Sequence, residues 1–310
     1  MLRFSKLFSL LAFFLLFLFF PLLVPNVFGQ AGIRQDDLPR SNVESSSTNL
    51  TDEQLRIGIR DQSIALGFPI PIFDWKLLPL ASHRHKILDI NPTTTFNLPG
   101  GSSVGTSTFP TDLYNTKVGL GLIFPVGDGG VVMRFMHGTE TDGRDISSED
   151  YVSVGQLLYD TDPEAKESWQ LGAIHTTAFG VSRTFPGIGY KYKGTEFAAR
   201  ILLPILFKLS FKLGDSFVIN TQARLEGGIY RLTEDAPWNS AVLRFSNIKS
   251  TLTFGWNFAG PFVLDAGVGW VSNRRWRIFE DGSDSNKLVQ FDLRDQIHYT
   301  IGIGFWPFEE

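Results

Sequence analysis

The sequence has no cysteine in its 310 residues. Disulfide bonds, cysteine-ligated zinc and thiol catalysis are therefore excluded, and the chain must be stabilised in other ways. It also lacks an excess of positive charge, since 28 Lys and Arg stand against 32 Asp and Glu, for a net charge of −4. That balance argues against nucleic acid as a partner. Glycine and aromatic residues are abundant instead, with 30 Gly and 28 Phe.

The N-terminus has the pattern of a secretory leader. Arg3 and Lys6 precede an apolar run over residues 7–24, and small residues follow at Gly29 and Ala31. A basic start, an apolar core and a small-residue cleavage site are typical of a signal peptide. We expect a signal peptide over residues 1–29, with cleavage after Ala31 as the alternative. An uncleaved anchor is a further reading, because the run is about as long as a short membrane-spanning helix.

Residues 30–85 differ in composition from the rest of the chain. Residues 30–56 are polar and rich in Ser, Asp and Glu, which is typical of a flexible tail. Residues 57–85 carry spaced Ile and Leu, but Pro69, Pro71 and Pro79 interrupt them. Because proline removes a ladder hydrogen bond, this part reads as an irregular segment or a plug in the mouth of a barrel. We expect 30–85 to be an N-terminal extension or plug, and 86–310 to be the main domain.

Residues 204–231 show the period of a β-hairpin. Apolar residues occupy every second position on each side of a turn at 214–216, which is strand period and not helix period. The apolar faces are Ile205, Phe207, Leu209, Phe211 and Leu213, then Phe217, Ile219, Ala223, Leu225 and Ile229, and the facing polar residues include Lys208, Lys212, Asn220, Gln222, Arg224 and Glu226. A transmembrane barrel turns such an apolar face toward lipid and the polar face toward a lumen.

Ten candidate strands follow from residue 86. They are 86–97, 113–124, 131–137, 150–159, 169–185, 195–213, 217–231, 242–258, 262–273 and 290–306. Their connections alternate in length, and short periplasmic turns opposite longer external loops are typical of outer-membrane barrels. The predicted fold is all-β: an antiparallel, transmembrane, up-and-down β-barrel of about ten strands, within a range of eight to twelve.

The chain resembles bacterial outer-membrane β-barrel proteins as a class. The leader, the alternating strands over about 86–306 and the last strand, with Tyr299, Ile301, Ile303 and Phe305 on one face, carry the resemblance. It implies location in the bacterial outer membrane, with membrane lipids and the barrel-insertion machinery as partners. Strand-end aromatics such as Trp169, Tyr230 and Trp270 agree with the girdles of such barrels.

Charged residues of the lumen-facing parity form a candidate network. Its members are Arg200, Lys208, Lys212, Arg224, Glu226, Lys249, Asp265, Arg294 and His298. Two interpretations stay open. In the first, paired charges fill the lumen structurally, because a buried charge needs a partner. In the second, a narrow pore has a waist at Arg224, Glu226, Asp265 and His298, and its basic excess favours small anionic solutes.

Three arginines near the end of a strand are candidates for contact with the membrane surface. Arg274, Arg275 and Arg277 flank Trp276, and guanidinium groups bind lipid phosphates in a bidentate manner. A solvated rim is the equally weighted alternative, because exposed charges are common.

No catalytic, metal or cofactor site is predicted. His83 and His85 are more often solvated than metal-bound at this spacing. His137 lies near Glu140, Asp142 and Asp145, as a rim site in an outer-membrane lipid hydrolase or protease would require, but no nucleophile–base spacing supports it. We expect no cofactor, and a narrow channel or a structural, surface-exposed protein. The alternatives are that outer-membrane enzyme and a secreted, soluble β-sandwich that binds a ligand.

Overall fold

The computed structural model describes residues 42–49, 57–90, 95–97, 103–105, 109–143, 146–232, 241–259, 262–280, 287–293 and 295–305. Among these residues the secondary structure is β-strand, apart from turns and a short 3₁₀ helix at Ser148–Asp150. No helix in these ranges has the length and apolarity needed to cross a membrane. The predicted signal peptide, residues 1–29, lies outside them, so it stays a prediction.

One sheet of 16 strands contains nearly all of the described strands. Its wall consists of β1 (Asn42–Asn49), β2 (Ile57–Gly67), β4 (Trp75–Ile90), β7 (Asp112–Val126), β8 (Gly129–Thr141), β9 (Tyr151–Asp160), β10 (Glu167–Thr176), β11 (Arg183–Lys193), β12 (Phe197–Leu203), β13 (Leu206–Leu213), β14 (Phe217–Arg231), β15 (Val242–Ala259), β16 (Phe262–Phe279) and β18 (Gln296–Phe305). The short strands β3 (Ile70–Ile72) and β17 (Lys287–Leu293) pair with β4 and β16. A separate hairpin joins β5 (Thr95–Asn97) and β6 (Ser103–Gly105).

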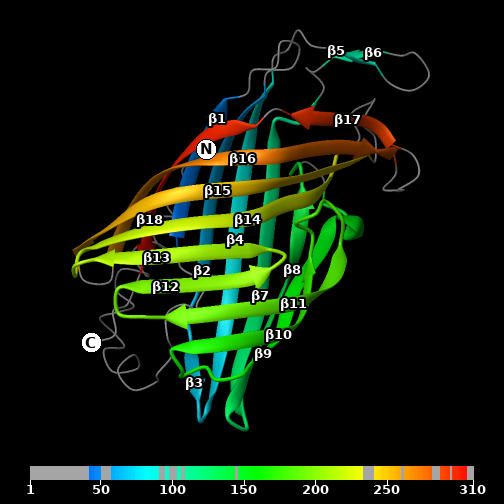
Figure 1. Cartoon of the computed structure of the whole chain (residues 1–310). Coiled ribbons are helices and arrows are strands. Elements are labelled where there is room, and N and C mark those ends of the chain that lie inside the picture. The colour runs from blue at the N-terminus through cyan, green and yellow to red at the C-terminus, as the bar shows by residue number, and fades with distance from the viewer. Residues whose placement is uncertain are drawn as a thin grey trace, which may run out of the picture. The chain divides into compact units, whose positions relative to one another are not determined.

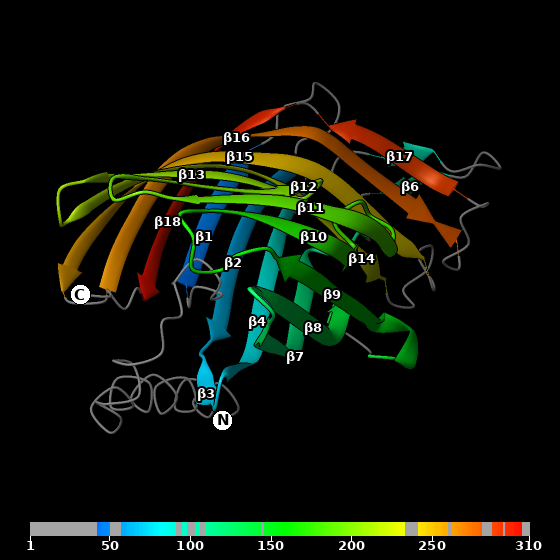
Figure 2. The ribbon, with the colours of Figure 1, turned by 60° about the horizontal axis from the view of Figure 1, so that its bottom comes forward.

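The wall closes on itself. Each of its fourteen strands pairs in antiparallel fashion with the next, and the pairs β15–β16, β16–β18 and β18–β1 complete the circuit. Figures 1 and 2 show β1, β2, β4 and β7 on one side of this barrel and β11 to β16 on the other. The even number of strands brings the start of β1 and the end of β18 to the same end. The all-β, antiparallel barrel expected from the sequence is therefore present.

The hairpin of β12 and β13 is shorter than the strands beside it. Pairing of β13 with β14 ends at Leu206 and Arg224, whereas β14 continues to Arg231. At that far end, Arg231 forms a parallel bridge with Thr141 of β8. The bridge closes a smaller ring, from β8 to β14, within the complete wall.

The wall has fourteen strands and not the predicted ten, and residues 57–85, predicted as an irregular segment or plug, form strands; so do residues 42–49 of the predicted tail, 30–56. β1, β2 and the first half of β4 pair with their neighbours in the wall. The prolines do not prevent this pairing: Pro69 lies between β2 and β3, Pro71 lies in the short β3, and Pro79 lies within β4. The segment 195–213 is two strands that turn at residues 204–205. β11 was not predicted, because Gly187 and Gly189 interrupt its alternating pattern. A Cβ atom at Gly187 would lie 3.0 Å from Ile174, and one at Gly189 would lie 2.9 Å from Gln170, so both positions have little room for a side chain.

The two ends of the barrel have connections of different length. One end, the short-turn end, has the turns 127–128, 194–196, 214–216 and 260–261. The opposite, long-loop end has the connections 91–111, 142–150 and 232–241, with the turn at 204–205 as its exception. This distribution agrees only in part with the alternation predicted from the sequence. Residues 186–194, predicted as a long connection, are mostly strand β11, and the connections 161–166 and 177–182, at opposite ends, have the same length.

The wall is polar on the inside and apolar on the outside. In β18, Gln296, His298 and Thr300 are buried, while Tyr299 and Ile301 are 66% and 57% exposed. The predicted parity of the hairpin is confirmed, since Phe207 and Phe211 are exposed and Asn220 and Glu226 are buried. A soluble sheet shows the opposite distribution, because water favours burial of the apolar face.

Apolar side chains pack together in the interior toward the long-loop end. Tyr230, Leu243, Phe245, Trp276 and Ile278 are each at most 2% exposed and come from β14, β15 and β16. They pack with Leu88 of β4 and with Leu113 of β7, and the ring centroids of Phe245 and Trp276 are 5.6 Å apart. We call this group the apolar cap. It gives the barrel a packed core despite its polar inner wall.

The outward orientation predicts how Leu252 responds to charge. Leu252 lies in the middle of β15 and is 51% exposed. Leu252→Arg should destabilise the barrel in lipid vesicles by about 2–4 kcal/mol, because an arginine near the bilayer midplane is costly. The control Leu252→Phe keeps the surface apolar and should stay near the wild type. Equal stability of the two variants in a denaturant titration would show that this face does not meet lipid.

Candidate functional site in the barrel interior

An ion network joins two parts of the wall that are not neighbours. Arg84 of β4 donates to both carboxylate oxygens of Glu226 in β14, at 3.1 Å each. Its Nε also lies 2.7 Å from Oδ1 of Asp61 in β2. Lys86 adds a bond to Asp61 at 2.8 Å, and Arg224 adds one to Glu226 at 2.6 Å. Both carboxylates are buried, so the network ties β2 and β4 to β14 through the interior.

A second network surrounds Glu140, which has no exposed surface. Lys117 donates to its Oε1 at 2.6 Å and Asn115 donates to the same atom at 2.8 Å. The backbone amide of Ile229 donates to its Oε2 at 2.6 Å. Glu140 therefore accepts a hydrogen bond from β14 beyond the point where β13 ends. Its carboxylate thus binds a backbone amide on the edge of β14 where no strand is paired.

A third network lies between β9, β10 and β11. Nζ of Lys191 lies 2.5 Å from Oδ2 of Asp160, and Gln170 donates to the same oxygen at 3.0 Å. All three side chains are buried. In each of the three networks, a carboxylate from one strand is neutralised by a cation from another strand. That arrangement satisfies the requirement that buried charges be paired.

The structure distributes the predicted lumen residues over several environments. Arg224, Glu226, Lys249, Asp265 and His298 lie on the inner parity, Arg200 is opposite Lys208 in the β12–β13 pair, Lys212 is exposed near a turn, and Arg294 lies outside the described residues. Most of the ion pairs that the structure contains were not predicted from the sequence. Asp61 and Arg84 lie in the segment that was predicted to be a plug. The alternation of polar and apolar residues along β2 and β4 could have identified both as inward-facing residues of strands.

The predicted waist is not assembled. Glu226 is opposite Asn247 of β15, whereas Asp265 is opposite Gly255 of the same strand. Those two positions are about 26 Å apart along β15, at about 3.3 Å per residue. His298 has its own partner, with Nε2 3.1 Å from Oγ1 of Thr251.

A β-bulge changes the orientation of the predicted rim arginines. Between the pairs Ser246–Arg275 and Ile248–Ser272, β16 has one residue more than β15, and Asn273 adopts a φ of 50°. The extra residue inverts the alternation. Arg274 is consequently 3% exposed and donates to Gln296 at 3.0 Å, so it does not lie on the rim surface. Arg275 is exposed, and Arg277 lies over the ring of Phe279 at 5.9 Å.

Four histidines, His83, His85, His137 and His175, lie on the outer parity of their strands. His83 bonds Thr116 at 2.7 Å, His85 bonds Asp112 at 2.7 Å, and His137 bonds Ser153 at 2.9 Å. His137 is not joined to the carboxylate of Glu140, which points into the barrel and is bound to Lys117. The predicted rim site around His137 is therefore not formed. Within the part of the chain that the structure describes, no group of three or more acidic or histidine side chains is placed to hold a metal ion.

No protein-family model matches the sequence, and no curated protein matches it. Among solved structures, the chain is similar to the β domain of the Bordetella autotransporter Brka, at 11% sequence identity. The match covers 85% of this chain and 97% of that chain, with a TM-score of 0.28. A likeness at this level carries no functional inference.

The Glu140 network predicts a large loss of stability for one substitution. Glu140→Ala leaves Lys117 as an unpaired buried cation and removes the acceptor of the Ile229 amide. Breaking a buried pair in this way costs about 3–5 kcal/mol. The control is Glu149→Ala, whose pair with Arg231 has a 62% exposed carboxylate side chain and should contribute less than about 1 kcal/mol. Denaturant titration in lipid measures both, and similar small losses would contradict a structural role for Glu140.

Proposed function

We propose that this protein is an integral β-barrel of the bacterial outer membrane with a closed interior, in a structural or surface-exposed role. The observation that carries the proposal is the inverted distribution of side chains. Neighbouring strands expose large apolar residues over a continuous band, including Val118 at 64%, Leu120 at 57% and Phe135 at 55%. Such patches mark contact with a membrane or another apolar partner.

The predicted signal peptide adds the route to that location. Secretion across the inner membrane would deliver the chain to the barrel-insertion machinery, and the lipids of the outer membrane would then cover the apolar band. The shared end of β1 and β18 is the short-turn end, which is periplasmic in outer-membrane barrels. The long-loop end would accordingly face outward.

A secreted β-sandwich fits the observations less well. A sandwich buries the apolar face of one sheet against a second sheet. Here the apolar face of the main sheet is the exposed one, and the buried face holds ion pairs and hydrogen bonds. Removal of lipid or detergent should therefore cause aggregation and not yield a soluble monomer.

The contacts in the interior favour a structural role for the barrel and argue against a narrow channel. The apolar cap brings together side chains from β4, β7, β14, β15 and β16, and the Arg84–Glu226 pair spans the interior next to it. Among the predicted lumen cations, Arg224 is bound to Glu226 and Lys212 is exposed near a turn, which reduces the basic excess that the anion pore requires. The narrow, anion-preferring channel remains the alternative.

Conductance distinguishes the two roles. Purified, folded protein in planar bilayers should give no single-channel steps, because the apolar cap and the ion pairs block the path. The double variant Phe245→Ala with Trp276→Ala should give steps if it retains the heat-modifiable gel migration of a folded barrel. Steps in the wild type would instead support the channel, and their reversal potential in a salt gradient would show whether chloride is preferred over potassium.

A further inference from the structure

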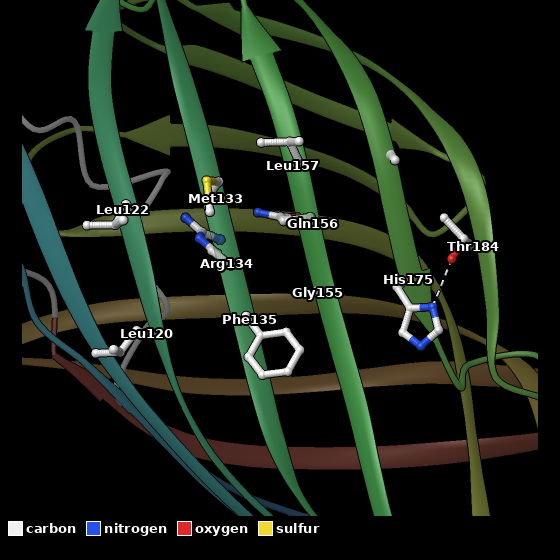
Figure 3. A pocket seen from close by; sticks show the side chains of 11 residues that line it. Leu120, Leu122, Met133, Arg134, Phe135, Gly155, Gln156, Leu157, His175 and Thr184 are labelled. Carbon is white, nitrogen blue, oxygen red and sulfur yellow. Dashed lines mark hydrogen bonds between the residues drawn. The ribbon is translucent and has the colours of Figure 1, made fainter.

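An apolar hollow of about 380 Å³ lies on the outer face of the wall, across β7 to β11. Leu120, Phe135, Gly155, His175 and Thr184 are successive cross-strand partners and form one row of it. Gly155 contributes no side chain, so the rings of Phe135 and His175 stand on either side of an open floor (Figure 3). The next row, toward the short-turn end, includes Leu122, Met133, Leu157 and Ala173.

His175 stands at the edge of this hollow with hydroxyl groups on both ring nitrogens. Its Nε2 is 3.0 Å from Oγ of Ser182, and its Nδ1 is 2.9 Å from Oγ1 of Thr184. Ser182 and Thr184 are exposed. With the proton on Nδ1, the ring donates to Thr184 and accepts the hydroxyl proton of Ser182. A base that contacts a serine and is oriented by a third group is the arrangement that activates a nucleophile.

The depth of these groups in the wall fits an ester of a membrane lipid. Toward the short-turn end the outer face is apolar, at Leu157, Ala173 and Met133, and toward the long-loop end it becomes polar at Ser153 and His137. Ser182 and His175 lie at that boundary, where a lipid places its ester carbonyls.

We propose that this surface is an acyl-ester hydrolase site for glycerophospholipids, with the acyl chain in the hollow, Ser182 as nucleophile and His175 as general base. It rests on the proposed function, since lipid must reach the outer wall. Oγ of Ser182 attacks the ester carbonyl carbon while Nε2 of His175 takes the proton. The proton then passes to the leaving alcohol, and lysophospholipid departs from the acyl-serine. Water, deprotonated by His175, then attacks the acyl carbon. The proton passes from His175 to Oγ of Ser182 as the acyl–serine bond breaks, which releases the fatty acid and restores Ser182.

Two readouts test the two catalytic residues. Full-length protein in detergent micelles that contain phosphatidylethanolamine should release fatty acid and lysophospholipid, detected by mass spectrometry, and a fluorophosphonate probe should label Ser182. Ser182→Ala should abolish both, and His175→Asn should reduce both by about 100-fold or more. The matched control is Ser153→Ala, which removes the hydroxyl of the other outward His–Ser pair and should leave both unchanged.

Two further variants separate positioning from chemistry. Ala173→Leu fills the hollow and should reduce release of long acyl chains while the small probe still labels Ser182. Thr184 acts as a positioning residue, so Thr184→Val should lower kcat with little change in KM, and Thr184→Ser should restore kcat.

Membrane insertion is measured separately, by flotation with vesicles of phosphatidylethanolamine and phosphatidylglycerol. Protein that floats but neither labels at Ser182 nor releases fatty acid would overturn the hydrolase site and leave the barrel intact. Labelling that survives Ser182→Ala would also overturn it. Protein that fails to float would refute the membrane location itself.

Discussion

Closure of the strand edges is the constraint on which the rest of the structure depends. An unpaired backbone group costs several kcal/mol in hydrocarbon, so an apolar outer wall is tolerable only when each strand edge has a partner. The β15–β16 and β18–β1 pairs satisfy most of that requirement. The short β12–β13 hairpin leaves one edge of β14 without a neighbouring strand near Ile229, and there Glu140 and Thr141 of β8 supply the contacts. A side chain thus completes what backbone pairing does not.

The same closure determines the chemistry of the interior. If lipid covers the apolar outer face, as proposed, polar residues of the opposite parity fill the inside, and charges removed from water need partners. The partners come from different strands, such as Asp61 with Arg84 and Asp160 with Lys191. The Arg84–Glu226 contact also connects strands on separate parts of the wall. The interior is therefore held by specific ion pairs between strands and by apolar packing at the long-loop end.

The alternation of apolar and polar residues made the all-β fold class and the inner and outer faces of the wall predictable. The number of strands was not predictable in this way, because it depends on which segments pair with each other. Phe207 and Phe211 could be assigned outward because period two alone determines their side. β1 could not be found, since the polar run Asn42–Asn49 becomes a strand only through its pairing with β2 and β18. Arg274 points inward because of an extra residue in β16, which no parity count reveals. Ser182 and His175 meet through tertiary register, so their spacing in the chain gave no signal.

The proposed site lies on the outside of the barrel, where side chains are not held in the interior ion pairs. Among the described residues, the inner carboxylates of Asp61, Glu140 and Glu226 are bound to cations, and these contacts hold the wall together. On the outer face, the histidines bind hydroxyl or carboxylate groups of adjacent strands. What distinguishes His175 among them is Gly155 opposite it. Where a side chain would otherwise cover the strand, glycine leaves room for a lipid chain beside a base and a serine.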